Sequence, residues 1–273
     1  MNQAINGINA INNKQEADHG QSHAFSCSQK SQGSTLHGSG FGQSRPGSAR
    51  MTSIVDIDVT FDLVCPWCLI GKRNLDRALG SVRHSYPDIM VRINWHGVQL
   101  LPDVPLEGLP FASFYEKRLG SKAAVQMRQA QVSDAAERAG LTIRLDRISV
   151  FPNTGKAHRL LKFAANNCDT TQYEALLEHL FAAYFVLGEN IGDEETLMKI
   201  AQSFGLDLDK LIAWQPASAA PDDGQQMHSG VPFFVFNQRY TLAGAQSSAV
   251  MFSLIQTLIK EELGHDTSFP AAA

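Results

Sequence analysis

The sequence predicts a mixed α/β protein whose sheet-forming segments are separated by a long helical block. Three observations support this prediction. Strand, helix and strand patterns follow one another between residues 54 and 101. Helical periodicity then continues from Pro110 to about Trp214, and two short strands and a last helix complete the pattern. The predicted order is β-α-β, a helical block, and β-β-α.

Residues 1–50 are rich in Asn, Gln, Ser and Gly and show no sustained hydrophobic period. Such a segment cannot bury enough apolar surface to offset the entropy lost on ordering, so we predict a disordered tail. A spacer, an extension upstream of Met51 and a weak transit peptide stay open as interpretations. The basic start and apolar stretch of a secretory signal are missing from it.

The first α/β unit begins with IVDIDVTFDLV, residues 54–64, in which apolar and polar residues alternate as in a strand with one buried face. From Pro66 the apolar residues recur at helical spacing, which predicts a helix that begins at or near Cys65 and stops at Gly80. Residues 88–101 form a second predicted strand, and strand-helix-strand order predicts parallel pairing.

The helical block contains five segments with a 3.6-residue stripe, most of which end in Gly. They are residues 111–120, 122–140, 155–167, 172–188 and 193–205. Residues 218–226 are a predicted loop. Residues 231–244 predict a hairpin around Asn237 and Gln238, and residues 247–264 predict a last helix capped by Ser247.

Composition restricts the class of function. The chain has 273 residues, 44% of them hydrophobic, so it can bury a full core without disulfide staples. The four cysteines are unevenly placed, which favours a reducing compartment, and we expect a cytoplasmic protein. A net charge of -4 argues against nucleic acid as a partner, and no apolar run is long enough to predict a membrane span.

The segment FDLVCPWCLIGKRNL places Cys65 and Cys68 where the first strand meets the helix. At a helix N-terminus the first thiol of such a pair meets the positive end of the helix dipole, which lowers its pKa to about 3.5–7.5. Cys65 would attack a substrate disulfide, and Cys68 would resolve the mixed disulfide. Pro66 suits the first helical position, and Trp67 would offer an apolar face beside the reactive sulfur.

Two other interpretations of the pair stay open. Free cysteines are often small buried hydrophobes. A zinc site needs about four ligands, and no second Cys or His pair at ligand spacing is present, so we predict no metal site.

Three segments together resemble the DsbA-like branch of the thioredoxin superfamily: CPWC after a strand, FPNTGKAHRLL at a helix start, and GVPFFVFNQRYTLAGAQ near the end. The resemblance is to the FrnE-like group, related to 2-hydroxychromene-2-carboxylate isomerases and kappa-class glutathione transferases. It implies a thioredoxin-like core with an inserted all-helical domain. The expected boundaries are a tail at 1–50, core residues 51–108 and 219–273, and the insertion at 109–218.

The resemblance also implies site residues far from the cysteines. The Val231–Pro232 bond is expected to be cis and to face the cysteine pair, with Gly230 permitting close approach of an extended substrate. Asn153 is expected to cap the helix that follows it, and in the isomerase and transferase relatives an Asn in this segment lines the pocket. Gln246 is expected to begin the last helix, where backbone N–H groups could receive a carboxylate such as that of glutathione.

Charged residues near the pair have a functional and a structural interpretation. Asp62 could take the proton of Cys68 if burial raises its pKa, or it could be a polar residue on the solvent side of the strand. Lys72 and Arg73 are expected on the solvated surface. His96 is expected to be a histidine with its hydrogen bonds satisfied.

The function that the sequence favours is a cytoplasmic thiol-disulfide oxidoreductase acting on disulfides of proteins or small molecules. It would require no cofactor, with glutathione as an optional co-substrate. A glutathione-dependent isomerase or transferase is the alternative, although such relatives usually carry serine in place of the first cysteine. A redox-regulated chaperone is a third interpretation, and the sequence leaves a homodimer open.

Overall fold

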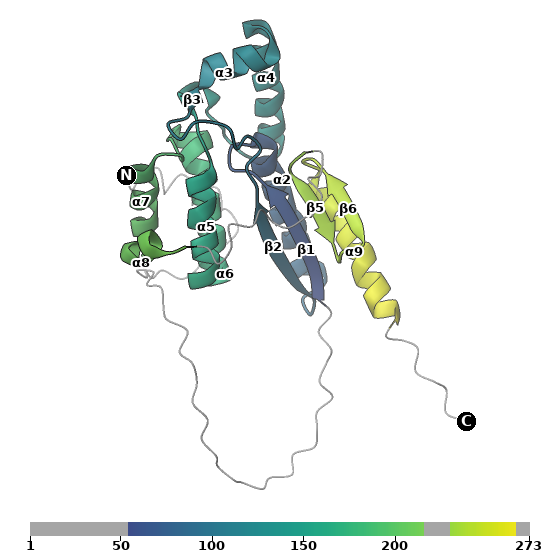
Figure 1. Ribbon diagram of the computed structural model, residues 1–273. Coiled ribbons are helices and arrows are strands. Elements are labelled where there is room, and N and C mark those ends of the chain that lie inside the picture. Colours follow the sequence, from purple (N-terminus) through teal and green to yellow (C-terminus); the bar gives the residue numbers. More distant parts are fainter. Residues whose placement is uncertain (1–53, 216–229, 266–273) are drawn as a thin grey trace, which may run out of the picture.

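The computed structural model describes residues 54–215 and 230–265. The predicted tail at 1–50 and the predicted loop at 218–226 lie outside these residues, as does the domain boundary near residue 218. In Figure 1 the strands form a central sheet, with helices packed beside it and a helical block extending to one side.

Four strands form the main sheet in the order β2-β1-β5-β6. They are β1 (Ile54–Phe61), β2 (Met90–Gly97), β5 (Phe233–Phe236) and β6 (Tyr240–Ala243). β1 pairs with β2 in parallel, as predicted, and with β5 antiparallel. The hairpin between β5 and β6 turns at Asn237 and Gln238, which both have positive φ angles and so confirm the predicted turn.

One face of the sheet is covered by α2 (Pro66–Ser85) and α9 (Ser248–His265). The alternating residues Val55, Ile57 and Val59 pack against apolar side chains of both helices. The prediction that α2 stops at Gly80 is wrong, because the helix continues for five more residues to Ser85. Gly80 is exposed on α2, and the apolar stripe continues past it to the buried Val82.

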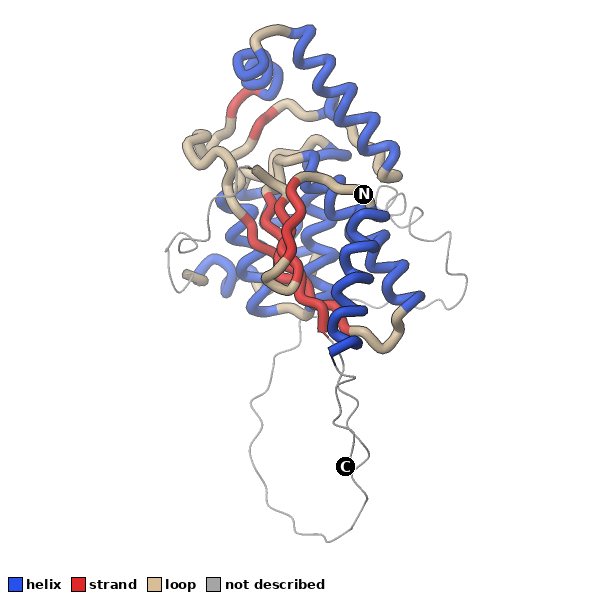
Figure 2. Tube along the Cα trace, turned by 90° about the vertical axis from the view of Figure 1, so that its right-hand side faces the viewer, coloured by secondary structure: helices blue, strands red, loops and turns tan. Residues whose placement is uncertain are grey.

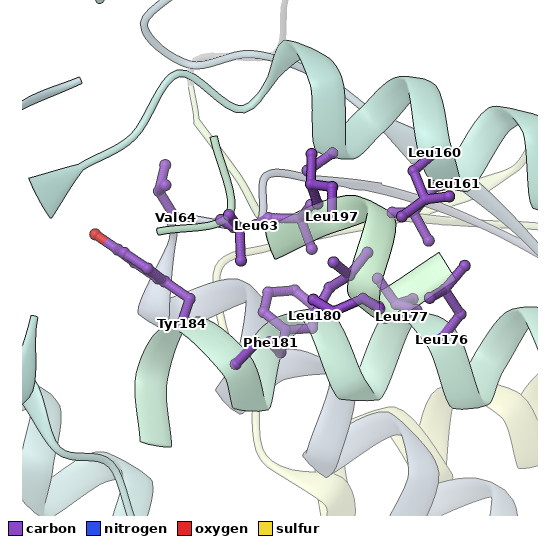
Figure 3. Close-up of a cluster of buried hydrophobic side chains, with 14 of the residues drawn as sticks. Leu63, Val64, Leu160, Leu161, Leu176, Leu177, Leu180, Phe181, Tyr184 and Leu197 are labelled. Atoms are coloured by element: carbon purple, nitrogen blue, oxygen red, sulfur yellow. The ribbon is translucent and has the colours of Figure 1, made fainter. Parts of the chain in front are cut away.

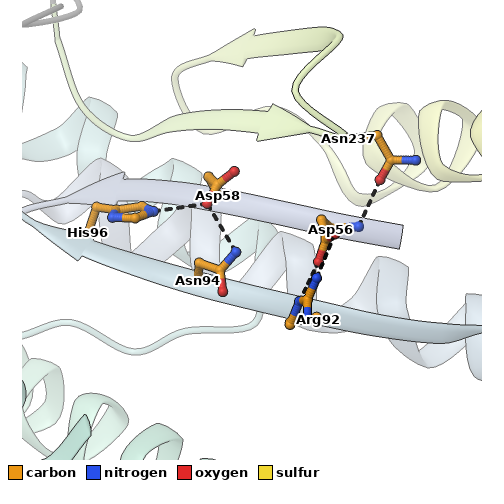
Figure 4. A network of polar contacts seen from close by, with 6 residues as sticks. All are labelled: Asp56, Asp58, Arg92, Asn94, His96 and Asn237. Atoms are coloured by element: carbon orange, nitrogen blue, oxygen red, sulfur yellow. Dashed lines mark hydrogen bonds and ion pairs between the residues drawn. The ribbon is translucent and has the colours of Figure 1, made fainter. Parts of the chain in front are cut away.

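The opposite face of β1 and β2 carries a network of polar side chains (Figure 4). Asp58 accepts hydrogen bonds from Asn94 and pairs with Nε2 of His96 at 2.9 Å. Asp56 forms a bidentate pair with Arg92 on the neighbouring strand. The hydrogen bonding of His96 is therefore satisfied, as predicted. Figure 2 shows the strands of this sheet lying beside the helices.

The inserted block contains each of the five predicted helices. They are α3 (Phe111–Leu119), α4 (Lys122–Arg138), α5 (Gly155–Asn167), α6 (Thr170–Ala182) and α7 (Glu194–Ser203). The structure adds α8 (Leu208–Ala213), a 3-10 turn (Leu145–Arg147) and a π-helical turn (Ala183–Leu187). It also adds a small sheet of β3 (Leu109–Pro110) and β4 (Val150–Phe151), so the insertion is mainly, not entirely, helical.

A second hydrophobic core joins this block to the segment that carries the cysteines (Figure 3). Leucines of α5 and α6 pack with Phe181, Tyr184 and the residues Leu63 and Val64, which follow β1. Cys65 and Cys68 belong to the same cluster. The insertion thus forms one wall of the cysteine environment.

Ion pairs between α2 and α6 add to this contact. The expectation that Lys72 and Arg73 lie on the solvated surface is wrong. Lys72, with only 8% of its side chain exposed, pairs with Asp76 and with Glu178 of α6, both at 2.9 Å. Arg73 pairs with Glu178 at 2.8 Å. Burial alone would lower the pKa of Lys72, and the charges of Asp76 and Glu178 outweigh burial and raise it.

We predict that Glu178→Gln lowers the free energy of unfolding by about 2–3 kcal/mol near neutral pH, because it leaves Lys72 and Arg73 with one fewer buried partner. The charges of Lys72 and Arg73 offset burial and lower the pKa of Glu178, so this contribution should be lost as pH falls through that lowered pKa. Chemical denaturation at several pH values measures both effects.

The control is Glu194→Gln, which removes the exposed pair between Lys156 and Glu194. This variant should unfold at nearly the same denaturant concentration as wild type. Equal destabilisation by the two variants would contradict the structural role of Glu178.

Candidate active site

The two cysteines occupy the start of α2. Cys65 is the N-cap residue, Pro66 is at the first helical position, and Cys68 lies in the first turn. The backbone N–H of Cys68 donates to the carbonyl of Cys65 at 3.0 Å, which brings the two residues onto the same turn. The predicted helix start is thus confirmed. No side chain caps α2, so its first N–H groups are available to a negative charge on Cys65.

The segment before β5 lies against this helix start. The Val231–Pro232 bond is cis, as the resemblance implies. The Sγ atom of Cys65 lies 3.6 Å from the carbonyl oxygen of Val231, although the two residues are 166 positions apart in the chain. Gly71 makes this approach possible, because a Cβ atom there would meet Pro232 Cγ at 3.0 Å and the ring of Phe234 at 3.1 Å. The fold therefore brings the carbonyl group of Val231 and the sulfur of Cys65 together.

The electrostatic surroundings make the two thiols unequal. A hydrogen bond from the Cys68 thiol, helped by the backbone N–H groups of Cys68 and Trp67, lowers the pKa of Cys65 against the opposing effect of burial. Burial raises the pKa of Cys68 well above its ordinary value, and the neighbouring Cys65 raises it further. Cys65 is therefore the more acidic of the two thiols.

Asp62 is fully buried beside the pair, with a relative exposure of 1%. The interpretation of Asp62 as a residue on the solvent side of the strand is therefore wrong. Its Oδ2 accepts a hydrogen bond from the backbone N–H of Leu100 at 2.9 Å, and its Oδ1 lies 2.9 Å from Nε2 of His158. The negative charge of Asp62 adds to the raised pKa of Cys68.

Asn153 is buried but does not occupy the N-cap of α5, which is Thr154. Its side chain still serves the helix start, because Oδ1 accepts from the N–H of Gly155 at 2.9 Å. The same oxygen accepts from Gln99, and Nδ2 donates to the carbonyl of Val104 at 2.6 Å. Asn153 therefore joins the loop after β2 to the start of α5.

Gln246 does not begin α9, because the helix starts two residues later at Ser248. The Gln246 side chain donates to the backbone carbonyl of Ala243. The backbone carbonyl of Gln246 accepts from the side chain of Asn74 in α2. Ser247 accepts from the N–H of Val250 at 3.3 Å, as expected for a cap. A carboxylate contact at this helix start stays a prediction.

The remaining predicted contact residues surround the cysteines. Trp67 is half-buried between two hydrophobic clusters, so less of its face is open than expected. Gly230 is exposed and has φ of +154°, a conformation that side-chain-bearing residues rarely adopt. A Cβ atom on Gly230 would meet nothing within 4 Å, so the glycine is needed for its backbone and leaves open space beside Val231.

Three residues of this site were not identified from the sequence: His158, Tyr115 and Tyr184. His158 lies in the quoted FPNTGKAHRLL segment, but its partner Asp62 is 96 positions away. Burial, with a smaller effect of nearby Cys65, raises the pKa of Tyr115 to about 12. The buried hydroxyl of Tyr184 has no hydrogen-bond partner among the described residues. Helical periodicity marks all three only as residues of the inserted block.

The profile of the DSBA-like thioredoxin domain matches residues 56–256 of the chain. The chain belongs to the DsbA-like thioredoxin family. This DsbA-like protein is 28% identical to the uncharacterized protein YwbO of Bacillus subtilis over 153 residues, which are 56% of this chain and 68% of YwbO.

Solved structures show the same fold. A probable DsbA oxidoreductase of Streptomyces coelicolor matches with a TM-score of 0.64 and 25% identity, covering 80% of this chain and 93% of that one. A 2-hydroxychromene-2-carboxylate isomerase matches with 0.53 and 13% identity over 77% and 98% of the two chains. The cytosolic disulfide reductase DsbM of Pseudomonas aeruginosa, solved with GSH, matches with 0.51 and 17% identity over 75% and 99%.

Residues 54–215 and 230–265 of this DsbA-like protein show neither a metal-binding cluster nor a membrane-spanning helix. No cluster of three His, Cys, Asp or Glu side chains there could hold a metal ion. No helix in the same part of the chain is long and apolar enough to cross a membrane.

We predict that Cys68→Ala raises the pKa of Cys65, because the variant removes the thiol that donates to Cys65. Cys68→Ser keeps a donor and should give a pKa closer to that of wild type. The pH dependence of alkylation at Cys65, followed by peptide mass spectrometry, measures this pKa separately from those of Cys27 and Cys168. The same alkylation midpoint in both variants would rule out the Cys68 thiol as the donor.

Proposed function

We propose that this protein is a cytoplasmic thiol-disulfide oxidoreductase that reduces or isomerises disulfides through Cys65 and Cys68. The observation that carries the proposal is the position of Cys65 Sγ at the start of α2, 3.6 Å from the Val231 carbonyl. A nucleophilic sulfur beside an open backbone segment suits attack on a disulfide in an extended chain. The unequal surroundings of the two thiols and the family of the chain support it.

The reaction follows from this geometry in two exchange steps. The Cys65 thiolate attacks one sulfur of the substrate disulfide, forms a mixed disulfide and expels the other sulfur as a thiolate. Cys68 then loses its proton to Asp62 and attacks the Cys65 sulfur. A Cys65–Cys68 disulfide forms, the second substrate thiolate leaves, and the substrate has gained two electrons. In isomerisation, the released substrate thiolate attacks the mixed disulfide instead.

Substrate contacts are proposed for the groups that border the cysteine pair. The backbone of Val231 can pair with an extended substrate once the Cys65 thiol no longer donates to its carbonyl. Gly230 leaves room for that backbone, while Pro66 and Trp67 provide apolar surface on the other side of the sulfur. Asn153 and Gln246 were predicted as further contacts. Their side chains hold internal hydrogen bonds, so we assign them to the support of the site.

The oxidised pair must be reduced again before another cycle. We propose a thiol such as glutathione as the electron donor, which makes glutathione a co-substrate and leaves the cysteines as the reacting groups. A lowered pKa at Cys65 and a raised one at Cys68 are what disulfide exchange needs, so we prefer it to glutathione-dependent isomerisation or transfer.

We predict that the protein accelerates insulin reduction in the presence of glutathione and that Cys65→Ser removes this activity. Cys68→Ser should accumulate a mixed disulfide at Cys65, because the resolving thiol is gone, and peptide mass spectrometry should detect it. Cys168→Ser is the matched control and should keep wild-type activity. If the Cys65→Ser protein reduces insulin as fast as wild type, the proposed mechanism is wrong.

A further inference from the structure

The buried carboxylate of Asp62 depends on two N–H donors from different parts of the chain. The backbone N–H of Leu100 donates to Oδ2, and Nε2 of His158 lies 2.9 Å from Oδ1. An ionised carboxylate with a relative exposure of 1% is costly unless such donors replace water. The backbone donor is fixed by the fold, whereas the second donor is a side chain that the inserted block supplies.

The imidazole of His158 is held in one orientation. The residue is 6% exposed, and Phe61 packs edge-on against the ring with the centroids 5.7 Å apart. A Cβ atom at Gly97 would lie 2.3 Å from Nδ1, so the backbone of β2 passes close to the ring. Gly97 pairs with Phe61 in the parallel ladder, so both contacts come from the β1–β2 edge of the sheet.

The hydrogen-bond partners indicate which ring nitrogen carries the proton. Nε2 faces the Asp62 carboxylate, which only accepts, while the buried Nδ1 has no hydrogen-bond partner in the part of the chain that the structure describes. A proton on Nδ1 would be a buried donor without an acceptor, and this is more costly than a bare lone pair. The arrangement therefore favours a proton on Nε2.

The other titratable groups around His158 lie at the edge of a cavity of about 220 Å³. His96 of β2, Lys162 of α5 and Tyr173 of α6 line this cavity together with His158. His96 is already paired with Asp58, and burial raises the pKa of Tyr173 above its ordinary range. Lys162 is exposed.

Asp62 also lies close to the start of α2, because its backbone carbonyl accepts from the N–H of Cys65 at 3.1 Å. The charge of Asp62 contributes to the raised pKa of Cys68 and to that of Tyr184. Of these groups, Cys68 is the one that must lose a proton in the exchange reaction. Asp62 thus pairs with His158 and acts electrostatically on Cys68.

We propose that His158 is a positioning residue for the resolving step: its Nε2–H group orients the Asp62 carboxylate to take the proton of Cys68. This inference rests on the proposed function. As Cys68 attacks the mixed disulfide, its proton moves to Asp62, the bond between Cys65 and the substrate sulfur breaks, and the departing thiolate takes up a proton. His158 keeps its own proton throughout.

The two exchange steps can be observed separately with dithiobis(nitrobenzoate), an aromatic disulfide that releases a coloured thiolate. Attack by Cys65 releases the first thiolate, and attack by Cys68 on the mixed disulfide releases the second. In a stopped-flow experiment the first phase therefore reports Cys65 and the second reports the resolving step. Cys68→Ser defines the first phase alone.

We expect His158→Leu to slow the second phase about tenfold or more and to leave the first phase within about twofold of wild type, since general-base catalysis contributes roughly 10²–10⁴-fold. His158→Gln keeps an N–H donor near the Nε2 position and should recover most of the rate.

Two further variants separate positioning from a merely structural role. Gly97→Ala retains the imidazole but forces it away from Gly97, so it should slow the second phase in the same direction as His158→Leu. His96→Leu removes a histidine that lines the same cavity but pairs with Asp58, and it should leave both phases unchanged. Thermal unfolding of each variant shows whether the fold persists.

Each outcome has one meaning. A second phase that is equally fast in wild type, His158→Leu and Gly97→Ala overturns the inference, while wild-type turnover still supports the proposed function. Slowing of both phases together, or equal slowing by His96→Leu, also overturns it. If wild type shows only the first phase, the two-cysteine mechanism itself is wrong.

Discussion

The short connection between β1 and α2 is the constraint on which the rest of the site depends. β1 ends at Phe61 and α2 begins at Pro66, so the four residues between them leave the sheet and start the helix. Asp62 and Cys65 both lie in this connection, and the N–H of Cys65 donates to the Asp62 carbonyl at 3.1 Å. The short connection therefore keeps the backbones of Asp62 and Cys65 close together.

The inserted block is part of the chemistry as well as part of the fold. It contributes His158 to Asp62, Tyr115 and Tyr184 to the surroundings of the thiols, and Glu178 to the ion pairs with α2. The sheet contributes side chains to the site from one face only. The other face of β1 and β2 carries the ion pairs of Asp56 and Asp58. The thioredoxin-like part carries the cysteine pair, and the insertion supplies much of its surroundings.

The sequence predicted the elements that depend on local pattern. Alternation in residues 54–64, helical spacing after Pro66 and the turn at Asn237 each depend on neighbouring residues, and the structure confirms them. A glycine after an apolar stripe is a local signal for a helix end, so Gly80 predicts the end of α2. The buried stripe of α2 continues past Gly80, and the helix continues with it. The family resemblance supplied the cis bond before Pro232, which local pattern alone would not distinguish from an ordinary proline.

Contacts between distant segments could not be predicted from the sequence. Lys72 and Arg73 read as surface residues because their partner Glu178 belongs to a helix more than a hundred residues away. The same is true of Asp62, whose burial depends on Leu100 and His158. A histidine in an amphipathic helix carries no sign of a carboxylate 96 positions earlier. The two cysteines are thus close together in the sequence, whereas most of the residues that surround them come from distant segments.

The contact between Cys65 and Val231 has a consequence for the protein during synthesis. A nascent chain carries both cysteines early, but the backbone segment that borders them is translated 166 residues later. Until that segment has left the ribosome and docked, Cys65 lacks the Val231 carbonyl that lies beside its sulfur in the folded protein. The surroundings of the first cysteine are therefore assembled late, after β1, β2 and the helical block have been translated.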